Sequence, residues 1–270
     1  MTRLLPLMPQ LISRQERFDV VGSTNDVVRG WLMDGTPEVC LARADEQSAG
    51  RGRDGRTWAA PPGGALLLSL GFRPVWLRPD QLWRLAAVVS LAMAEAGEEV
   101  ARLPEGTIAL KWPNDLVVEA PGGLRKLAGV LGETDGIGTD DPRAVIGIGV
   151  NGAWSRGEFP ADLADAMTSL AELASGRIDH DTLLTLFVDR LEPRVDDLRH
   201  GQFDRLGWSE RQVTTDRDVD LVGADGSRTT VTATGVDVET GALLVDGRPV
   251  FVGEIAHVRL TDVAAARGGV

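Results

Sequence analysis

The chain has little of what disulfide-bonded and metal-binding proteins need. Its 270 residues include one cysteine and three histidines. The single Cys40 excludes an internal disulfide and a cysteine-based structural zinc site, and its apolar neighbours predict a buried strand position. His180, His200 and His257 lie far apart in the sequence and lack the spacing of metal ligands, so we expect no catalysis from them.

Long apolar runs and excess positive charge are also missing. No apolar run reaches the length of a membrane span, and the first ten residues, interrupted by two prolines, are too short for a signal peptide. We therefore expect a cytoplasmic protein without membrane partners. A net charge of −12 argues against a protein that coats nucleic acid, because such binding needs many Lys and Arg to neutralise phosphates.

The apolar patterns that are present predict an α+β protein. A hydrophobic content of 43% is enough for one large domain and a small one. Helical spacing runs over 24–32, from Pro79 onward, over 162–174, and over 181–198 with a kink at Pro193. Strand-like runs, which we expect to form a mostly antiparallel sheet, lie at 38–44, 65–72, 108–112, 116–118, 126–133 and 144–150.

The pattern changes after Gly207. Short β-prone runs at 219–222, 229–238, 242–245 and 249–252 alternate with glycine turns, which predicts a small all-β barrel. We therefore expect a catalytic domain over 1–206 and a C-terminal domain over 207–270, with the boundary near 203–208. Residues 264–270 are expected to fray.

Residues 45–58 place three arginines between three glycines in an otherwise acidic chain. Glycine lets backbone N–H groups turn toward a ligand, and arginine gives a charged fork for phosphate or carboxylate. The segment is therefore an expected anion-binding loop. A flexible solvated loop or an RNA-binding segment is the alternative on composition alone.

Two further clusters support the anion-binding interpretation. Lys-Trp-Pro-Asn-Asp stands at 111–115 and Arg-Lys-Leu-Ala-Gly-Val-Leu at 125–131, and Ser-Thr-Asn stands at 23–25. Together with the arginine loop, and over about residues 18–260, the chain resembles biotin protein ligases. That family adenylates biotin and passes it to a lysine of a carboxylase.

The resemblance implies a fold, an activity and partners. The fold would be a class II synthetase-like biotin/lipoate ligase domain followed by an SH3-like barrel. ATP with Mg²⁺ would activate biotin as biotinyl-5′-AMP, and the acceptor would be the biotin carboxyl carrier domain of acyl-CoA or pyruvate carboxylases. A ligand-linked homodimer is compatible with the family. Its two-function members carry a winged helix that represses transcription, but only about 20 residues precede Ser23, so we expect no specific DNA binding.

The resemblance also implies the site residues. The biotin site would comprise Ser23, Thr24, Asn25, Gln47, Arg51, Gly52, Arg53, Lys126 and Gly129. The nucleotide site would comprise Arg53, Arg56, Trp58, Asn114 and Asn151. The catalytic groups would be Lys126, Arg51, Asp115 and Lys111. No metal ligands are identified, and Mg²⁺ is expected on the ATP phosphates.

The residue types suit this chemistry, because a carboxylate and a triphosphate must meet and positive charge is needed between them. Asp115 could then take a proton from the acceptor lysine or hold its ammonium. Structural alternatives remain: Ser23 and Thr24 could cap a helix, Lys126 could end a strand in solvent, and Asp115 could cap its turn or pair with Lys111.

Asp54 stands where many family members have a basic or neutral residue, and we expect it to face solvent. Lipoate protein ligases share the fold and chemistry and are the nearest enzymatic alternative. A nucleotide- or RNA-binding module without catalysis is the alternative from another class, and the net charge of −12 counts against it.

Overall fold

The computed structural model describes residues 11–223 and 225–251, and the backbone of 257–260. The predicted frayed segment 264–270 and the end of the predicted strand 249–252 lie outside these residues. Within them, no helix is both long and apolar enough to cross a membrane.

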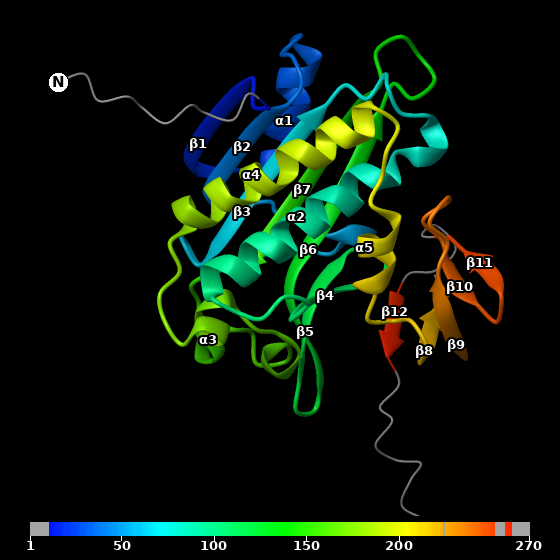
Figure 1. The fold of residues 1–270 in the computed structure, drawn as a ribbon. Helices are drawn as coiled ribbons and strands as arrows, with labels where there is room; N and C mark the ends of the chain where they lie inside the picture. Colours follow the sequence, from blue (N-terminus) through cyan, green and yellow to red (C-terminus); the bar gives the residue numbers. More distant parts are fainter. Residues whose placement is uncertain (1–10, 224, 252–256, 261–270) are drawn as a thin grey trace, which may run out of the picture.

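A seven-stranded sheet forms the larger part of the molecule (Figure 1). Its strands follow the order β1-β2-β3-β7-β6-β5-β4, with β1 parallel to β2 and every other neighbouring pair antiparallel. The expected mostly antiparallel sheet is therefore confirmed. The strands are β1 Arg14–Val21, β2 Cys40–Gln47, β3 Ala65–Phe72, β4 Ile108–Lys111, β5 Asp115–Ala120, β6 Gly123–Asp135 and β7 Arg143–Asn151.

Helices cover both faces of this sheet. The long helices α2 Trp83–Ala101 and α4 His180–Arg199 lie side by side across one face, and α4 continues through Pro193 (Figure 1). On the other face, α1 Thr24–Met33 packs Val28 and Leu32 against β2 and β7 in a separate apolar cluster. Cys40 belongs to that cluster, and burial raises the pKa of its thiol to about 11, as expected for a structural cysteine.

Three local predictions are corrected by the structure. The strand β1 is not predicted, because it lies at the sheet edge and carries few apolar residues. The expected helix over 162–174 is wrong: the segment holds a short 3₁₀ turn, Ala164–Ala166, and the helix α3, Leu170–Ala174. Ser169 explains the restart, since its side chain caps α3 by accepting from the Glu172 N–H. The helix expected from Pro79 begins at Trp83, after a 3₁₀ turn.

The C-terminal unit is a small antiparallel sheet of order β11-β10-β9-β8-β12. Among the described residues β11 and β12 stand at opposite edges, so the closed barrel is not confirmed. The expected boundary at 207 falls inside α5, Arg205–Glu210. The strands are β8 Arg217–Val222, β9 Arg228–Val236, β10 Leu243–Val245, β11 Arg248–Val250 and β12 His257–Leu260.

Candidate active site

The start of α1 forms the first part of the site. Ser23 holds the N-cap position, Thr24 and Asn25 open the helix, and all three are buried. The Thr24 backbone N–H and hydroxyl lie 2.8 and 3.0 Å from Gln47 Oε1 at the end of β2. The Ser23 side chain makes no capping hydrogen bond, so the helix-cap alternative explains its position but not its side chain.

Asn25 connects this helix end to the sheet. Its Nδ2 donates to Glu133 Oε2 over 2.6 Å, and its Oδ1 lies 2.6 Å from the Ser69 hydroxyl. The Ser69 hydroxyl is also 2.7 Å from the Thr24 hydroxyl. A Cβ on Gly147 of β7 would overlap Asn25 Oδ1, so only glycine leaves room for the amide there. Three of the predicted biotin-binding residues, Thr24, Asn25 and Gln47, therefore share one hydrogen-bond network with Ser69 and Glu133.

Arg51 reaches the same network from the arginine loop. Its guanidinium donates two bonds of 2.8 and 2.7 Å to the Asp26 carboxylate and lies 3.4 Å from Glu133 Oε2. This pairing lowers the pKa of Asp26 and raises the pKa of Arg51. An anionic ligand at Arg51 would have to compete with Asp26.

Lys126 and Asp115 form the second charged centre. Lys126 Nζ lies 2.6 Å from Asp115 Oδ1, with side-chain exposures of 34% and 15%. A register shift between Leu116 and Val117 in the β5–β6 pairing sets the strand position of Lys126. Lys111 lies opposite Asp115 in the hairpin register. Because Lys126 pairs with the largely buried Asp115, it is not a lysine at a strand end in solvent.

Trp58 lies against the glycines of the sheet beside this ion pair. A Cβ on Gly149 would overlap its indole, and one on Gly129 would be 3.1 Å from it. The Lys126 ammonium lies 5.4 Å from the centre of the Trp58 ring, within the range of a cation–π contact. The half-buried Arg53 has a lowered pKa because of its burial. Loop and sheet thus meet around Lys126.

The predicted nucleotide residues differ in how they are used. Asn151 is fully buried, its Nδ2 donates to the Thr168 and Lys126 carbonyls, and its Oδ1 has no hydrogen-bond partner among the described residues. A buried acceptor without a partner is a good candidate to receive a hydrogen bond from a bound ligand. By contrast, the Asn114 amide donates to the Val130 carbonyl and fixes its own turn.

The middle of the arginine loop forms a tight turn. The Gly52 N–H donates to the Arg56 carbonyl over 2.7 Å, and the Arg56 side chain is exposed at the loop surface. Asp54 faces solvent, as expected, with 43% of its side chain exposed and an ion pair of 3.8 Å to Arg53.

The structure brings most of the predicted residues to one face of the sheet, the face that α1 covers. Sequence reasoning missed three residues that organise them: Asp26, Ser69 and Glu133. Ser69 had a readable signal, since it is the one polar residue in the apolar run 65–72. Asp26 and Glu133 border recognised motifs, but nothing in the spacing predicts that they meet at Arg51.

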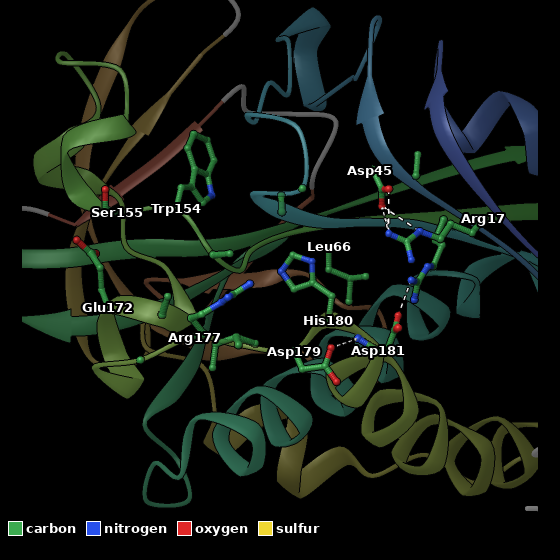
Figure 2. A pocket seen from close by; sticks show the side chains of 18 residues that line it. Arg17, Asp45, Leu66, Trp154, Ser155, Glu172, Arg177, Asp179, His180 and Asp181 are labelled. Carbon is green, nitrogen blue, oxygen red and sulfur yellow. Dashed lines mark hydrogen bonds and ion pairs between the residues drawn. The ribbon is translucent and has the colours of Figure 1, made fainter.

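A cavity of about 700 Å³ lies elsewhere, near the start of α4 (Figure 2). None of the predicted site residues lines it. Its acidic groups already have partners: Asp45 pairs with Arg17, Asp181 with Arg43, Asp179 caps α4, and Glu172 accepts from the Thr168 hydroxyl. We therefore assign it no part in the chemistry.

Among the residues that the structure describes, no three His, Cys, Asp or Glu side chains gather so that they could hold a metal ion. The acidic groups of the site are instead paired with arginine or lysine.

The chain is similar to known proteins in both sequence and fold. Residues 18–151 match the model of the biotin/lipoate A/B protein ligase family. The biotin–[acetyl-CoA-carboxylase] ligase of Mycobacterium tuberculosis is 31% identical over 266 residues, which covers 94% of each chain. The bifunctional ligase/repressor BirA of Bacillus subtilis is 33% identical over 186 residues, 68% of this chain and 54% of that protein, so the chain spans about half of its length.

The fold is likewise that of a known structure, a biotin protein ligase from Aquifex aeolicus in complex with biotin and ATP. The TM-score is 0.73 at 25% identity, covering 93% of this chain and 100% of that one. The mixed sheet with its helices and the separate small C-terminal sheet form the biotin protein ligase fold. On sequence and fold together, the chain belongs to the biotin/lipoate A/B protein ligase family.

Proposed function

We propose that the chain is an ATP-dependent biotin protein ligase. It would form biotinyl-5′-AMP from biotin and ATP and then transfer biotin to a lysine of a biotin carboxyl carrier domain. Its membership of the family supports this, as do the name of the M. tuberculosis relative and the biotin and ATP bound to the A. aeolicus ligase.

One observation carries the proposal: the Lys126–Asp115 pair of 2.6 Å lies beside Trp58, on the sheet face that also holds Asn25. A cation, a carboxylate and an aromatic wall are thus next to a buried amide and hydroxyl network. Such a site can take a ligand with a polar ring at one end and an anion at the other.

In the first step, a biotin carboxylate oxygen attacks the α-phosphorus of ATP and pyrophosphate leaves. No general base is needed, because the nucleophile is already ionised. Lys126, Arg51 and Arg53 supply positive charge where the two anions meet, and Lys111 adds charge at the neighbouring strand end. Thr24, Asn25 and Gln47 bind the ureido ring of biotin with Ser23, while Gly52 and Gly129 allow close approach.

In the second step, the amine of the acceptor lysine attacks the carbonyl carbon of the anhydride and AMP leaves. The amine must lose a proton, and Asp115 is the carboxylate that we propose accepts it. The transfer of Lys126 from Asp115 to the adenylate phosphate would free that carboxylate for the acceptor.

Further parts of the proposal concern the nucleotide, the metal and the domains. Asn151, Trp58, Arg56 and Asn114 are the proposed nucleotide contacts, and Mg²⁺ is proposed to arrive on the ATP phosphates. The domain division at 206/207 and the SH3-like character of the C-terminal unit remain proposals. So do acyl-CoA and pyruvate carboxylases as acceptors, a ligand-linked homodimer and the lack of specific DNA binding.

Pyrophosphate exchange tests the proposal directly. Biotin should drive exchange of label between pyrophosphate and ATP in the presence of Mg²⁺, and lipoate and octanoate should not. Equal exchange with lipoate would overturn the proposed specificity for biotin. No exchange with any of the acids would favour a binding module without catalysis.

A further inference from the structure

We infer that Glu133 is a positioning residue of the biotin site, one that fixes the orientation of Asn25 and links it to Arg51. The inference rests on the proposed function, in which Asn25 binds the biotin ring and Arg51 the carboxyl or phosphate. Glu133 itself lies at the far end of β6 from Lys126 and is no part of the recognised motifs.

One oxygen of Glu133 receives three donors. Its Oε2 lies 2.6 Å from Asn25 Nδ2, 2.9 Å from an Arg29 nitrogen and 3.4 Å from an Arg51 nitrogen. The side chain is 29% exposed, so the contacts are partly shielded from solvent. Hydrogen bonds to a charged acceptor are stronger than those between neutral groups.

A carboxylate can only accept, and this fixes the direction of the whole network. Asn25 must turn its NH₂ toward Glu133, and its Oδ1 therefore faces the Ser69 hydroxyl, 2.6 Å away. Ser69 has one proton and must give it to this Oδ1. The Thr24 hydroxyl lies 2.7 Å from Ser69 Oγ and 3.0 Å from Gln47 Oε1, so the network continues to the end of β2.

Without the charge of Glu133 the hold on Asn25 would weaken. A neutral amide oxygen at position 133 could still accept from Asn25, Arg29 and Arg51, but hydrogen bonds to a neutral acceptor are weaker than those to a carboxylate. The Asn25 amide, and with it the donor and acceptor pattern offered to the ureido ring of biotin, would be held less firmly. Weaker binding of biotin is the direct consequence.

The same carboxylate connects the two ends of the ligand site. When an anionic ligand takes Arg51 from Asp26 and Glu133, Asn25 and Arg29 remain on Glu133. Its removal should therefore act first on biotin binding and only second on the chemical step.

The test compares Glu133→Gln with Asp135→Asn. Asp135 lies two residues further along β6 and pairs with Arg143 over 3.5 Å, away from the network, so the control removes one carboxylate charge from the same strand. In biotin-dependent exchange, E133Q should raise the KM for biotin about tenfold, as expected for a lost charged hydrogen bond, with kcat within about threefold of the unchanged chain. D135N should match the unchanged chain in both.

A second pair of variants tests the direction of the hydrogen bonds. Asn25→Asp sets a carboxylate against Glu133, and adding Glu133→Gln supplies an NH₂ donor to it while Ser69 still donates as before. Biotin affinity, measured by calorimetry, should be at least about tenfold higher in the double variant than in N25D alone.

The outcomes distinguish a failure of the proposed function from a failure of the proposed role of Glu133. Absence of biotin-dependent exchange in the unchanged chain overturns the proposed function. If that exchange is present, equal KM values for E133Q and D135N, or a double variant no better than N25D, overturn the role of Glu133 alone.

Discussion

Single side chains set the charge balance of the site, and Lys126 is the clearest case. Its ammonium is bound by Asp115 over 2.6 Å and faces the Trp58 ring. Replacing Lys126 by Ala removes positive charge where two anions must approach. Adenylate formation should fall by at least about 10²-fold, the scale of losing one oriented stabilising group. The rate of biotin-dependent pyrophosphate exchange measures it.

Arg125→Ala is the matched control, because it removes one positive charge from the adjacent position of β6. Its exchange rate should stay within about threefold of the unchanged chain. If K126A loses no more activity than R125A, Lys126 has no special role in adenylate formation.

His180 gives a pH dependence of stability. It lies half-buried against Gly152, and burial, with the nearby Arg43, lowers the pKa of its ring below the ordinary 6.5. The unfolded chain therefore binds more protons at this group as pH falls below about 6.5, and stability is lost in that range by up to about 1.4 kcal/mol per pH unit. Thermal unfolding between pH 7 and 5 measures it.

His180→Gln should flatten that decline, since the variant has no ring to protonate. His200→Gln is the control: His200 is 68% exposed, so its removal should leave the slope unchanged. Identical slopes in H180Q and the unchanged chain would contradict the assignment.

At the scale of elements, the glycines of β6 and β7 make the surface on which the arginine loop rests. Gly149→Ala would place a Cβ inside the Trp58 indole and push that ring off the sheet. Overpacking of this kind costs about 1–3 kcal/mol, so exchange activity should fall by about tenfold or more. Trypsin should also cut the loop at Arg51, Arg53 or Arg56 faster.

Gly132→Ala is the control on the neighbouring strand, because its nearest new contact is Ile146 Cδ1 at 3.4 Å, an ordinary distance. Activity and proteolysis should change little in G132A. If G149A and G132A behave alike, Trp58 does not need the glycine surface.

The sequence predicted the elements that have strong apolar patterns, but it predicted only part of the candidate site. The run at 65–72 is β3 in its full extent, because a central strand buried on both faces leaves a continuous apolar signal. The edge strand β1, which is mostly exposed, leaves no continuous apolar signal. The motifs identified Lys126, Asp115 and Arg51, whereas Glu133 joins the site through a fold contact to Asn25, 108 positions away in the sequence. Contacts of that range follow from topology and not from local pattern.

At the scale of the whole molecule, the two sheets share one apolar core. Val219, Ala233 and Leu243 of the small sheet belong to the same buried cluster as α2 and β3. The Trp112 indole N–H donates to the Gly241 carbonyl over 2.9 Å. Trp112 begins the turn that ends at Asp115, so the C-terminal unit contacts the turn that precedes the proposed proton acceptor.

Gly241 and Gly247 allow this connection to be tested, because both have φ of +74°. Alanine at either position costs about 1–2 kcal/mol of backbone strain. Only at Gly241 would the new Cβ also overlap a side chain, the Trp83 ring, whereas Gly247 has open space. G241A should therefore lower the melting temperature several degrees more than G247A.

Because the displaced hairpin carries the carbonyl that holds Trp112, biotin transfer to a purified carboxyl carrier domain should slow in G241A and not in G247A. Calorimetry and acceptor labelling measure the two effects, and equal losses in both variants would show that the C-terminal unit does not reach Asp115.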